Sequence, residues 1–180
     1  NNGTTALIAA IKAFDMRPGE IITTPFSFSA TTHAVSLAGF EPVFVDIEPR
    51  TLNIDPSKIE SAITENTRAI MPVHVYGNPC QIKEIVAIAE RHSLRVIVDA
   101  AHAFGVDCDC GQLHTVPDAS VLSFHATKVF HTVEGGAVIT RDPAIKKRLD
   151  LLCNFGIEDE DTVRFAGLNG KLSELHAAMG

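Results

Sequence analysis

Lys128 is the residue whose surroundings most favour covalent chemistry. It follows the segment SFHAT at 123–127, which leaves the end of a predicted strand, and it precedes the apolar pair Val129 and Phe130. A lysine that is partly removed from water has a lowered pKa and becomes a better nucleophile. The pattern therefore indicates an amine that can bond to a carbonyl carbon.

Two further features indicate what Lys128 would work with. Asp99 ends the apolar run at 96–98, where a carboxylate loses solvation and needs a cationic or hydrogen-bonding partner to stay ionised. Gly3, Thr4 and Thr5 open a predicted helix, whose amides, hydroxyls and dipole favour a phosphate, and Ser123 could add another hydroxyl. A phosphate cradle, a partner for a pyridinium nitrogen and a Schiff-base lysine are what pyridoxal phosphate requires.

Hydrophobic periodicity predicts the elements that position these residues. Helices are predicted at 4–14, 30–38, from 55–57 onward, 81–92, 143–152 and 172–179. Strands are predicted at 20–24, 42–47, 69–75, 95–99, 120–124 and 136–140. This alternation predicts one α/β domain over 1–180, with a mainly parallel, doubly wound sheet. Ligands bind such sheets at the carboxyl ends of the strands, so we expect Phe28, His74, Asp99 and the segment 123–128 to share one crevice.

The composition limits the classes of function. The 180 residues carry 15 Lys and Arg against 22 Asp and Glu, a net charge of −7, and the basic residues are scattered. We therefore expect no nucleic-acid partner. Every apolar run is interrupted before the roughly 18 residues that a membrane span needs, so we expect no membrane partner. The four cysteines accompany no secretory segment, and the sequence predicts a cytoplasmic protein.

The sequence resembles the DegT/DnrJ/EryC1/StrS family of sugar aminotransferases, which are fold-type-I pyridoxal-phosphate enzymes. The similar stretches are NNGTTAL at 1–7, PFSFSATTHAV at 25–35, PVFVDI at 42–47, PVHVYG at 72–77, VDAAHAFG at 98–105, SFHATK at 123–128, EGGAVIT at 134–140 and LNGKLSELHAAMG at 168–180. Members of the family are roughly twice as long. The resemblance thus implies that 1–180 is the large cofactor-binding domain, without an amino-terminal segment and a small carboxy-terminal domain.

The resemblance also implies roles for individual residues. Lys128 would form the Schiff base with pyridoxal 5′-phosphate, and Asp99 would pair with its pyridine nitrogen. Phe28 would stack on the ring, and His102 would lie near the 3-oxygen, where many relatives have Gln. The implied phosphate site on this subunit consists of Gly3, Thr4, Thr5 and Ser123. Asn169 would reach the phosphate of a partner subunit, so a homodimer with a shared active site is implied.

The implied reaction is transamination of a nucleotide-linked keto-deoxyhexose, with glutamate as the amino donor. The runs SFHATKVFHTVEGG and DAAHAFG resemble the branch that acts on dTDP-4-keto-6-deoxyhexoses. A dehydratase branch has histidine in place of the lysine, so Lys128 argues against that branch.

Two alternatives stay open: an inactive domain that only binds the cofactor, and a zinc site. The zinc ligands would be His102, Cys108, Cys110 and His114, although a Cys-x-Cys pair is closer than structural zinc sites usually have. We therefore predict no metal.

Overall fold

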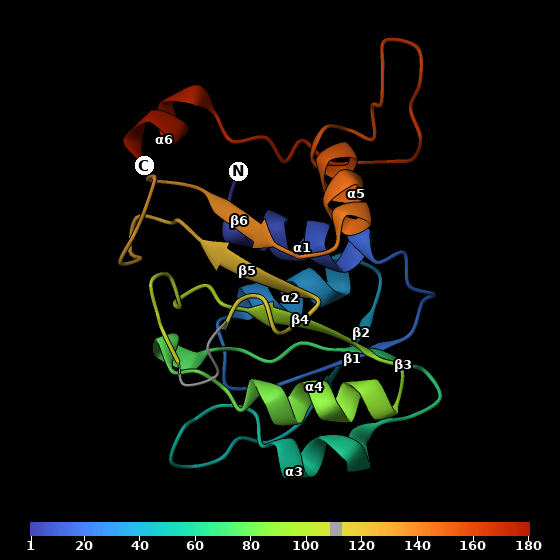
Figure 1. The fold of residues 1–180 in the computed structure, drawn as a ribbon, viewed down its shortest axis with the longest axis vertical. Coiled ribbons are helices and arrows are strands. Elements are labelled where there is room, and N and C mark those ends of the chain that lie inside the picture. Colours follow the sequence, from blue (N-terminus) through green and yellow to red (C-terminus); the bar gives the residue numbers. More distant parts are fainter. Residues whose placement is uncertain (109–112) are drawn as a thin grey trace.

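The computed structural model describes residues 1–108 and 113–180, and a six-stranded sheet lies at its centre (Figure 1). The strand order is β2-β1-β3-β4-β5-β6. The strands are β1 (Glu20–Thr23), β2 (Glu41–Phe44), β3 (Thr67–Ile70), β4 (Arg95–Asp99), β5 (Ala119–Ser123) and β6 (Gly136–Ile139). All neighbouring pairs are parallel except β5 and β6, which are antiparallel. The prediction of a mainly parallel α/β sheet is confirmed.

Helices cover both faces of the sheet (Figure 1). On one face α1 (Gly3–Ala13) packs against α2 (Ser29–Leu37), α5 (Pro143–Cys153) and the strands β4, β5 and β6. On the other face α4 (Ile82–Arg91) packs against β3, β4 and the short α3 (Pro56–Ile59). The short helices η1 (Glu60–Ala62) and η2 (Val75–Gly77) lie in connections. The chain after α5 leads away from the sheet to α6 (Glu174–Met179), near both termini (Figure 1).

Strand β4 shows why the sequence contains a continuous apolar run. Val96 and Val98 belong to the core beside α4, whereas Ile97 belongs to the core beside α1 and α2. Successive side chains of a strand point to opposite faces, so a strand covered on both faces is apolar at every position. Burial on both sides places the end of β4, and thus Asp99, deep in the molecule.

Two predicted strands extend at least three residues past the ends of the observed ones. The strand predicted at 69–75 ends at Ile70 as β3, although Val73 still forms an isolated parallel bridge with Asp99. Pro72 has no N–H to donate, and its carbonyl accepts from the Asp99 amide. The strand predicted at 42–47 ends at Phe44 as β2, an edge strand of the sheet.

Among the described residues, no helix has the length and hydropathy to cross a bilayer.

Candidate active site

A cleft of about 850 Å³ opens at the carboxyl ends of β4 and β5 and is bordered by the start of α1. Its lining includes Phe28, His74, Asp99, Ser123 and Lys128. The prediction that these residues share one crevice is therefore confirmed. These residues come from four separate segments of the chain, which meet here because parallel strands end at the same edge of the sheet.

Asp99 lies at the floor of the cleft and is 4% exposed. Its Oδ2 accepts a hydrogen bond from Thr31 Oγ1 at 2.7 Å, and its Oδ1 accepts from the Ala101 amide at 3.0 Å. Burial raises the pKa of Asp99, while these hydrogen bonds and the charges of His102 and Lys128 oppose that rise. Within the described part of the chain, Asp99 forms no ion pair.

Lys128 lies half-buried on the loop after β5 and lines the same cleft. Its backbone amide donates to the carbonyl of His125 at 2.9 Å, which folds the SFHATK segment into a turn. Burial lowers the pKa of Lys128, and the charge of Asp99 opposes this effect. A lowered pKa increases the neutral, nucleophilic fraction of the amine.

The first turn of α1 presents hydrogen-bond donors to the cleft. The Asn2 side chain caps the helix by accepting from the Thr5 amide at 2.8 Å, and the Ala6 amide donates to the Asn2 carbonyl. Amides of the first helical turn have no partner inside the helix, so those of Gly3 and Thr4 can bind a ligand. Gly3 and Thr4 line the cleft.

Glycines allow this helix end to approach the sheet closely. A Cβ on Gly3 would lie 2.9 Å from Ser123 Cβ and 3.0 Å from its Oγ. A Cβ on Gly136 would lie 2.9 Å from the carbonyl carbon and oxygen of Asn2. The buried Ser123 hydroxyl therefore lies directly beside the amino end of α1, as a phosphate site requires.

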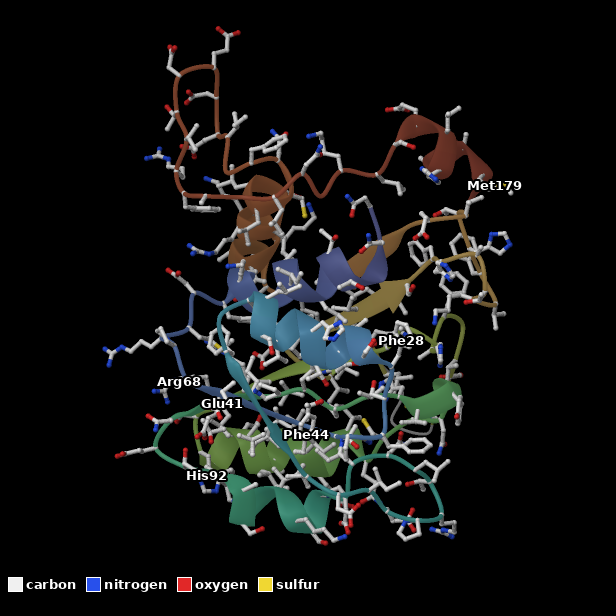
Figure 2. The ribbon with its side chains drawn as sticks, turned by 180° about the vertical axis from the view of Figure 1, so that it is seen from behind. Phe28, Glu41, Phe44, Arg68, His92 and Met179 are labelled. Atoms are coloured by element: carbon white, nitrogen blue, oxygen red, sulfur yellow. The ribbon has the colours of Figure 1, made fainter. Side chains whose placement is uncertain are left out.

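Aromatic side chains surround the mouth of the cleft. Phe28 is 78% exposed and lies at the start of α2 (Figure 2). Tyr76 is 75% exposed, has a φ of 55°, and lies parallel to the His102 ring with centroids 6.3 Å apart. Burial, followed by the charge of Lys128, lowers the pKa of His102, so a neutral ring is favoured. These flat rings can border a planar ligand.

Comparisons with known proteins agree with this geometry. The model of the DegT/DnrJ/EryC1/StrS aminotransferase family matches residues 1–180. The chain belongs to this family. It is 57% identical over 180 residues to the dTDP-4-amino-4,6-dideoxy-D-glucose transaminase of Shigella dysenteriae, covering 100% of this chain and 49% of that protein. The chain thus spans about half the length of this curated relative.

Solved structures of other proteins share the fold. DesI in the presence of its TDP-sugar product has a TM-score of 0.93 at 40% identity, over 99% of this chain and 45% of that one. NtdA from Bacillus subtilis with bound cofactor PMP has a TM-score of 0.92 at 37% identity, over 99% of this chain and 41% of that one. The mainly parallel α/β sheet is therefore a fold that this chain shares with sugar aminotransferases of known structure.

Not every residue predicted from the family resemblance lies in the cleft. Gly3, Thr4 and His102 line it, but Thr5 is absent from the lining, and its amide donates to the Asn2 side chain. Asn169 is exposed and outside the cleft of its own chain, where its carbonyl accepts from the Asn1 side chain. That position leaves the predicted contact with a partner subunit untested.

Sequence reasoning missed some residues that line the cleft or contact its residues from behind. Asn2 precedes the predicted helix and would have been found as its N-cap, because Asn is favoured there. Thr31 carried no signal, because its contact with Asp99 joins positions 68 residues apart. His125 and Glu134 both line the cleft, and His125 Nε2 lies 3.6 Å from Glu134 Oε1.

His74 and the zinc alternative involve histidines near the cleft. The His74 side chain is 1% exposed, its Nδ1 accepts from the Cys80 amide, and burial lowers its pKa to about 4. Of the four zinc candidates, Cys110 lies outside the described residues, and His114 Nε2 contacts the Ala103 carbonyl at 3.1 Å. Residues 1–108 and 113–180 contain no group of three or more potential metal ligands.

Proposed function

We propose that the protein is a pyridoxal-phosphate-dependent aminotransferase that acts on a nucleotide-linked keto-deoxyhexose, with glutamate as the amino donor. The observation that carries this proposal is the meeting of Lys128, Asp99 and the amino end of α1 in one cleft. Family membership supports it, as does the name of the relative with 57% identity.

The residues of the cleft fit the cofactor. A buried carboxylate is costly unless a cation compensates it, and the described hydrogen-bond donors to Asp99 are neutral groups on Thr31 and Ala101. A protonated pyridine nitrogen would supply the missing positive charge. The amides of Gly3 and Thr4, with the Ser123 hydroxyl, would hold the phosphate.

When bound, pyridoxal phosphate supplies an aldehyde that bonds to amines and a ring that accepts the electron pair left on a deprotonated substrate carbon. In this proposal, Lys128 Nζ is the amine that anchors the cofactor and later the base that moves the proton. Asp99 keeps the ring nitrogen protonated. Phe28 and His102 would orient the ring, the first by stacking and the second by donating a hydrogen bond to the 3-oxygen.

The finer substrate assignment rests on the relatives. The protein with 57% identity is named as a dTDP-4-amino-4,6-dideoxy-D-glucose transaminase, and the DesI structure was determined in the presence of its TDP-sugar product. We infer that the substrate here is a dTDP-4-keto-6-deoxyhexose and that the amine is placed on C4. A zinc enzyme or an inactive cofactor-binding domain is not favoured by any of these relatives.

We also infer a homodimer with a shared active site. Phe28 and Tyr76 are largely exposed in the lining of the cleft, and Val129, which follows the cleft residue Lys128 in the sequence, is 93% exposed. Large exposed apolar groups that lie close together commonly mark an interface. Asn169 lies outside its own cleft, which is compatible with a contact across such an interface.

Two experiments on the full-length protein test the proposal. Borohydride reduction after loading with pyridoxal phosphate should place the label on the peptide that contains Lys128, with Lys171 as a lysine that stays unlabelled. Incubation with glutamate and a panel of nucleotide-linked keto sugars should give an amino sugar. NMR should then assign the new amine to C4. A label elsewhere, or no aminated product from any keto sugar, would contradict the assignment. Bound stoichiometric zinc would instead support the metal alternative.

A further inference from the structure

The hydroxyl groups of Ser27 and Thr31 form a short chain that ends on Asp99. Thr31 Oγ1 lies 2.7 Å from Asp99 Oδ2, and Ser27 Oγ lies 2.6 Å from Thr31 Oγ1. Thr31 is 0% exposed, and Ser27 is half-buried in the lining of the cleft. These two hydroxyl groups therefore link the edge of the cleft to the buried carboxylate of Asp99.

The direction of these hydrogen bonds depends on the charge state of Asp99, and the ionised carboxylate is the state that the proposed function uses. An ionised carboxylate has no proton, so Thr31 must donate its only hydroxyl proton to Asp99 Oδ2. The Thr31 oxygen can then only accept, which makes Ser27 the donor to Thr31. The arrangement gives Asp99 Oδ2 a neutral donor that favours the ionised carboxylate, in a site where burial disfavours it.

Helix α2 provides this donor and the aromatic border of the cleft in a single turn. Phe28 is the N-cap of α2, and its carbonyl accepts from the Thr31 amide at 3.1 Å. Ser27 directly precedes the Phe28 N-cap, and its hydroxyl meets Thr31 in the first turn of α2. The orientation of the Asp99 carboxylate is thereby fixed to the same turn that carries Phe28.

We propose that Thr31, held by Ser27, is a positioning residue that orients the Asp99 carboxylate toward the cofactor's ring nitrogen and sustains its charge. The inference rests on the proposed function, because the ring nitrogen belongs to that proposal. Thr31 does not touch the reacting atoms in this scheme and acts through Asp99. The other groups that act on the Asp99 carboxylate are the Ala101 amide, which donates to Oδ1, and His102 and Lys128 by their charges. The His74 amide donates to the backbone carbonyl of Asp99.

The experiment compares Thr31→Val, Thr31→Ser and the control Thr32→Val in the full-length protein. Thr31→Val keeps the shape and removes the hydroxyl, whereas Thr31→Ser keeps the hydroxyl. Thr32 is the next residue of α2 and is half-buried, so its change to Val repeats the chemical alteration away from Asp99. Without cofactor, the ¹³C carboxyl signal of Asp99, assigned with Asp99→Asn, is titrated with pH. With cofactor, the affinity for pyridoxal phosphate is measured by fluorescence.

Thr31→Val should move the Asp99 titration midpoint to higher pH, because the ionised carboxylate loses a donor. It should also weaken pyridoxal-phosphate binding at neutral pH by on the order of ten-fold, the size expected for a hydrogen bond to a charged group. Thr31→Ser should restore both values, and Thr32→Val should leave both unchanged. A merely structural role for Thr31 would not move the carboxyl midpoint.

Identical midpoints and affinities for Thr31→Val and Thr32→Val would overturn the inference. If Thr31→Val does not fold, Ser27→Ala answers the same question, since it removes the donor to Thr31, and an unchanged midpoint then counts against the inference. If the wild-type protein binds no pyridoxal phosphate, the proposed function fails, while the titration without cofactor still decides the role of Thr31. The two failures are therefore distinguishable.

Discussion

The close approach of α1 to Ser123 makes Gly3→Ala the most direct test of the phosphate site. The new Cβ would lie 2.9 Å from Ser123 Cβ, closer by roughly 0.6 to 1 Å than the usual separation of carbon atoms in contact. Such overpacking costs about 1–3 kcal/mol, and exchanging Gly for Ala in a helix returns about 0.5–1 kcal/mol. We therefore expect Gly3→Ala to lower the free energy of unfolding by about 1 kcal/mol.

The same change should weaken the binding of pyridoxal phosphate. Relief of the overlap requires the helix end to move away from Ser123, which separates the amides of Gly3 and Thr4 from the Ser123 hydroxyl. We expect the affinity to fall by on the order of ten-fold, the loss that corresponds to about one charge-assisted hydrogen bond. Equilibrium unfolding in urea and a fluorescence titration with pyridoxal phosphate measure the two effects.

A double-mutant cycle identifies the cause. Ser123→Gly removes the side chain that the new methyl group at position 3 would meet, so the destabilisation in the double variant should be smaller than the sum of the two single changes. Additive effects would show that the overlap at Ser123 is not responsible. An unchanged cofactor affinity in Gly3→Ala would refute the placement of the phosphate at this helix end.

Three other outcomes follow from the structure. Burial lowers the pKa of His74 to about 4, so the stability this group contributes is present above pH 6.5 and is lost as pH falls toward 4. The free energy of unfolding of the wild type should fall by as much as about 3 kcal/mol over this window. His74→Asn, which keeps an acceptor for the Cys80 amide, should lose less stability over the same window. Burial raises the pKa of Cys80 to about 12, so iodoacetamide should modify this thiol only in unfolded protein, and rapid modification of the native protein at neutral pH would contradict its burial. Asn2→Ala should cost about 1 kcal/mol in urea unfolding by removing the acceptor for the Thr5 amide, whereas an unchanged midpoint would show that the cap contributes nothing.

The fold and much of the site could be predicted because they depend on local patterns. Strand β4 and the acidic residue at its end were both visible in the run at 95–99, and the rule for strand ends placed Asp99 and the SFHATK segment at one edge. The position of Lys128 in the cleft followed from the same rule. The cytoplasmic location and the roles of the individual residues stay predictions.

Contacts between distant segments could not be predicted in this way. The strand predicted at 69–75 was too long because apolar residues continue past Pro72, where the backbone has no N–H to donate. The Thr5 amide donates to the Asn2 cap, and this contact depends on where the helix begins. Thr31 meets Asp99 only after α2 has packed on the sheet, so no pattern within a short window contains that contact.

The buried carboxylate of Asp99 connects the stability of the protein with its proposed chemistry. Burial raises the pKa of Asp99, so the group stabilises the fold when protonated, and that contribution is lost as pH rises above the ordinary carboxyl range and through the raised value. Thr31 and Ala101 offset part of this loss without supplying a positive charge. A cationic ring nitrogen would supply that charge in the same place. The buried carboxylate that makes the cofactor-free protein less stable would therefore also bind the cofactor and keep its ring protonated.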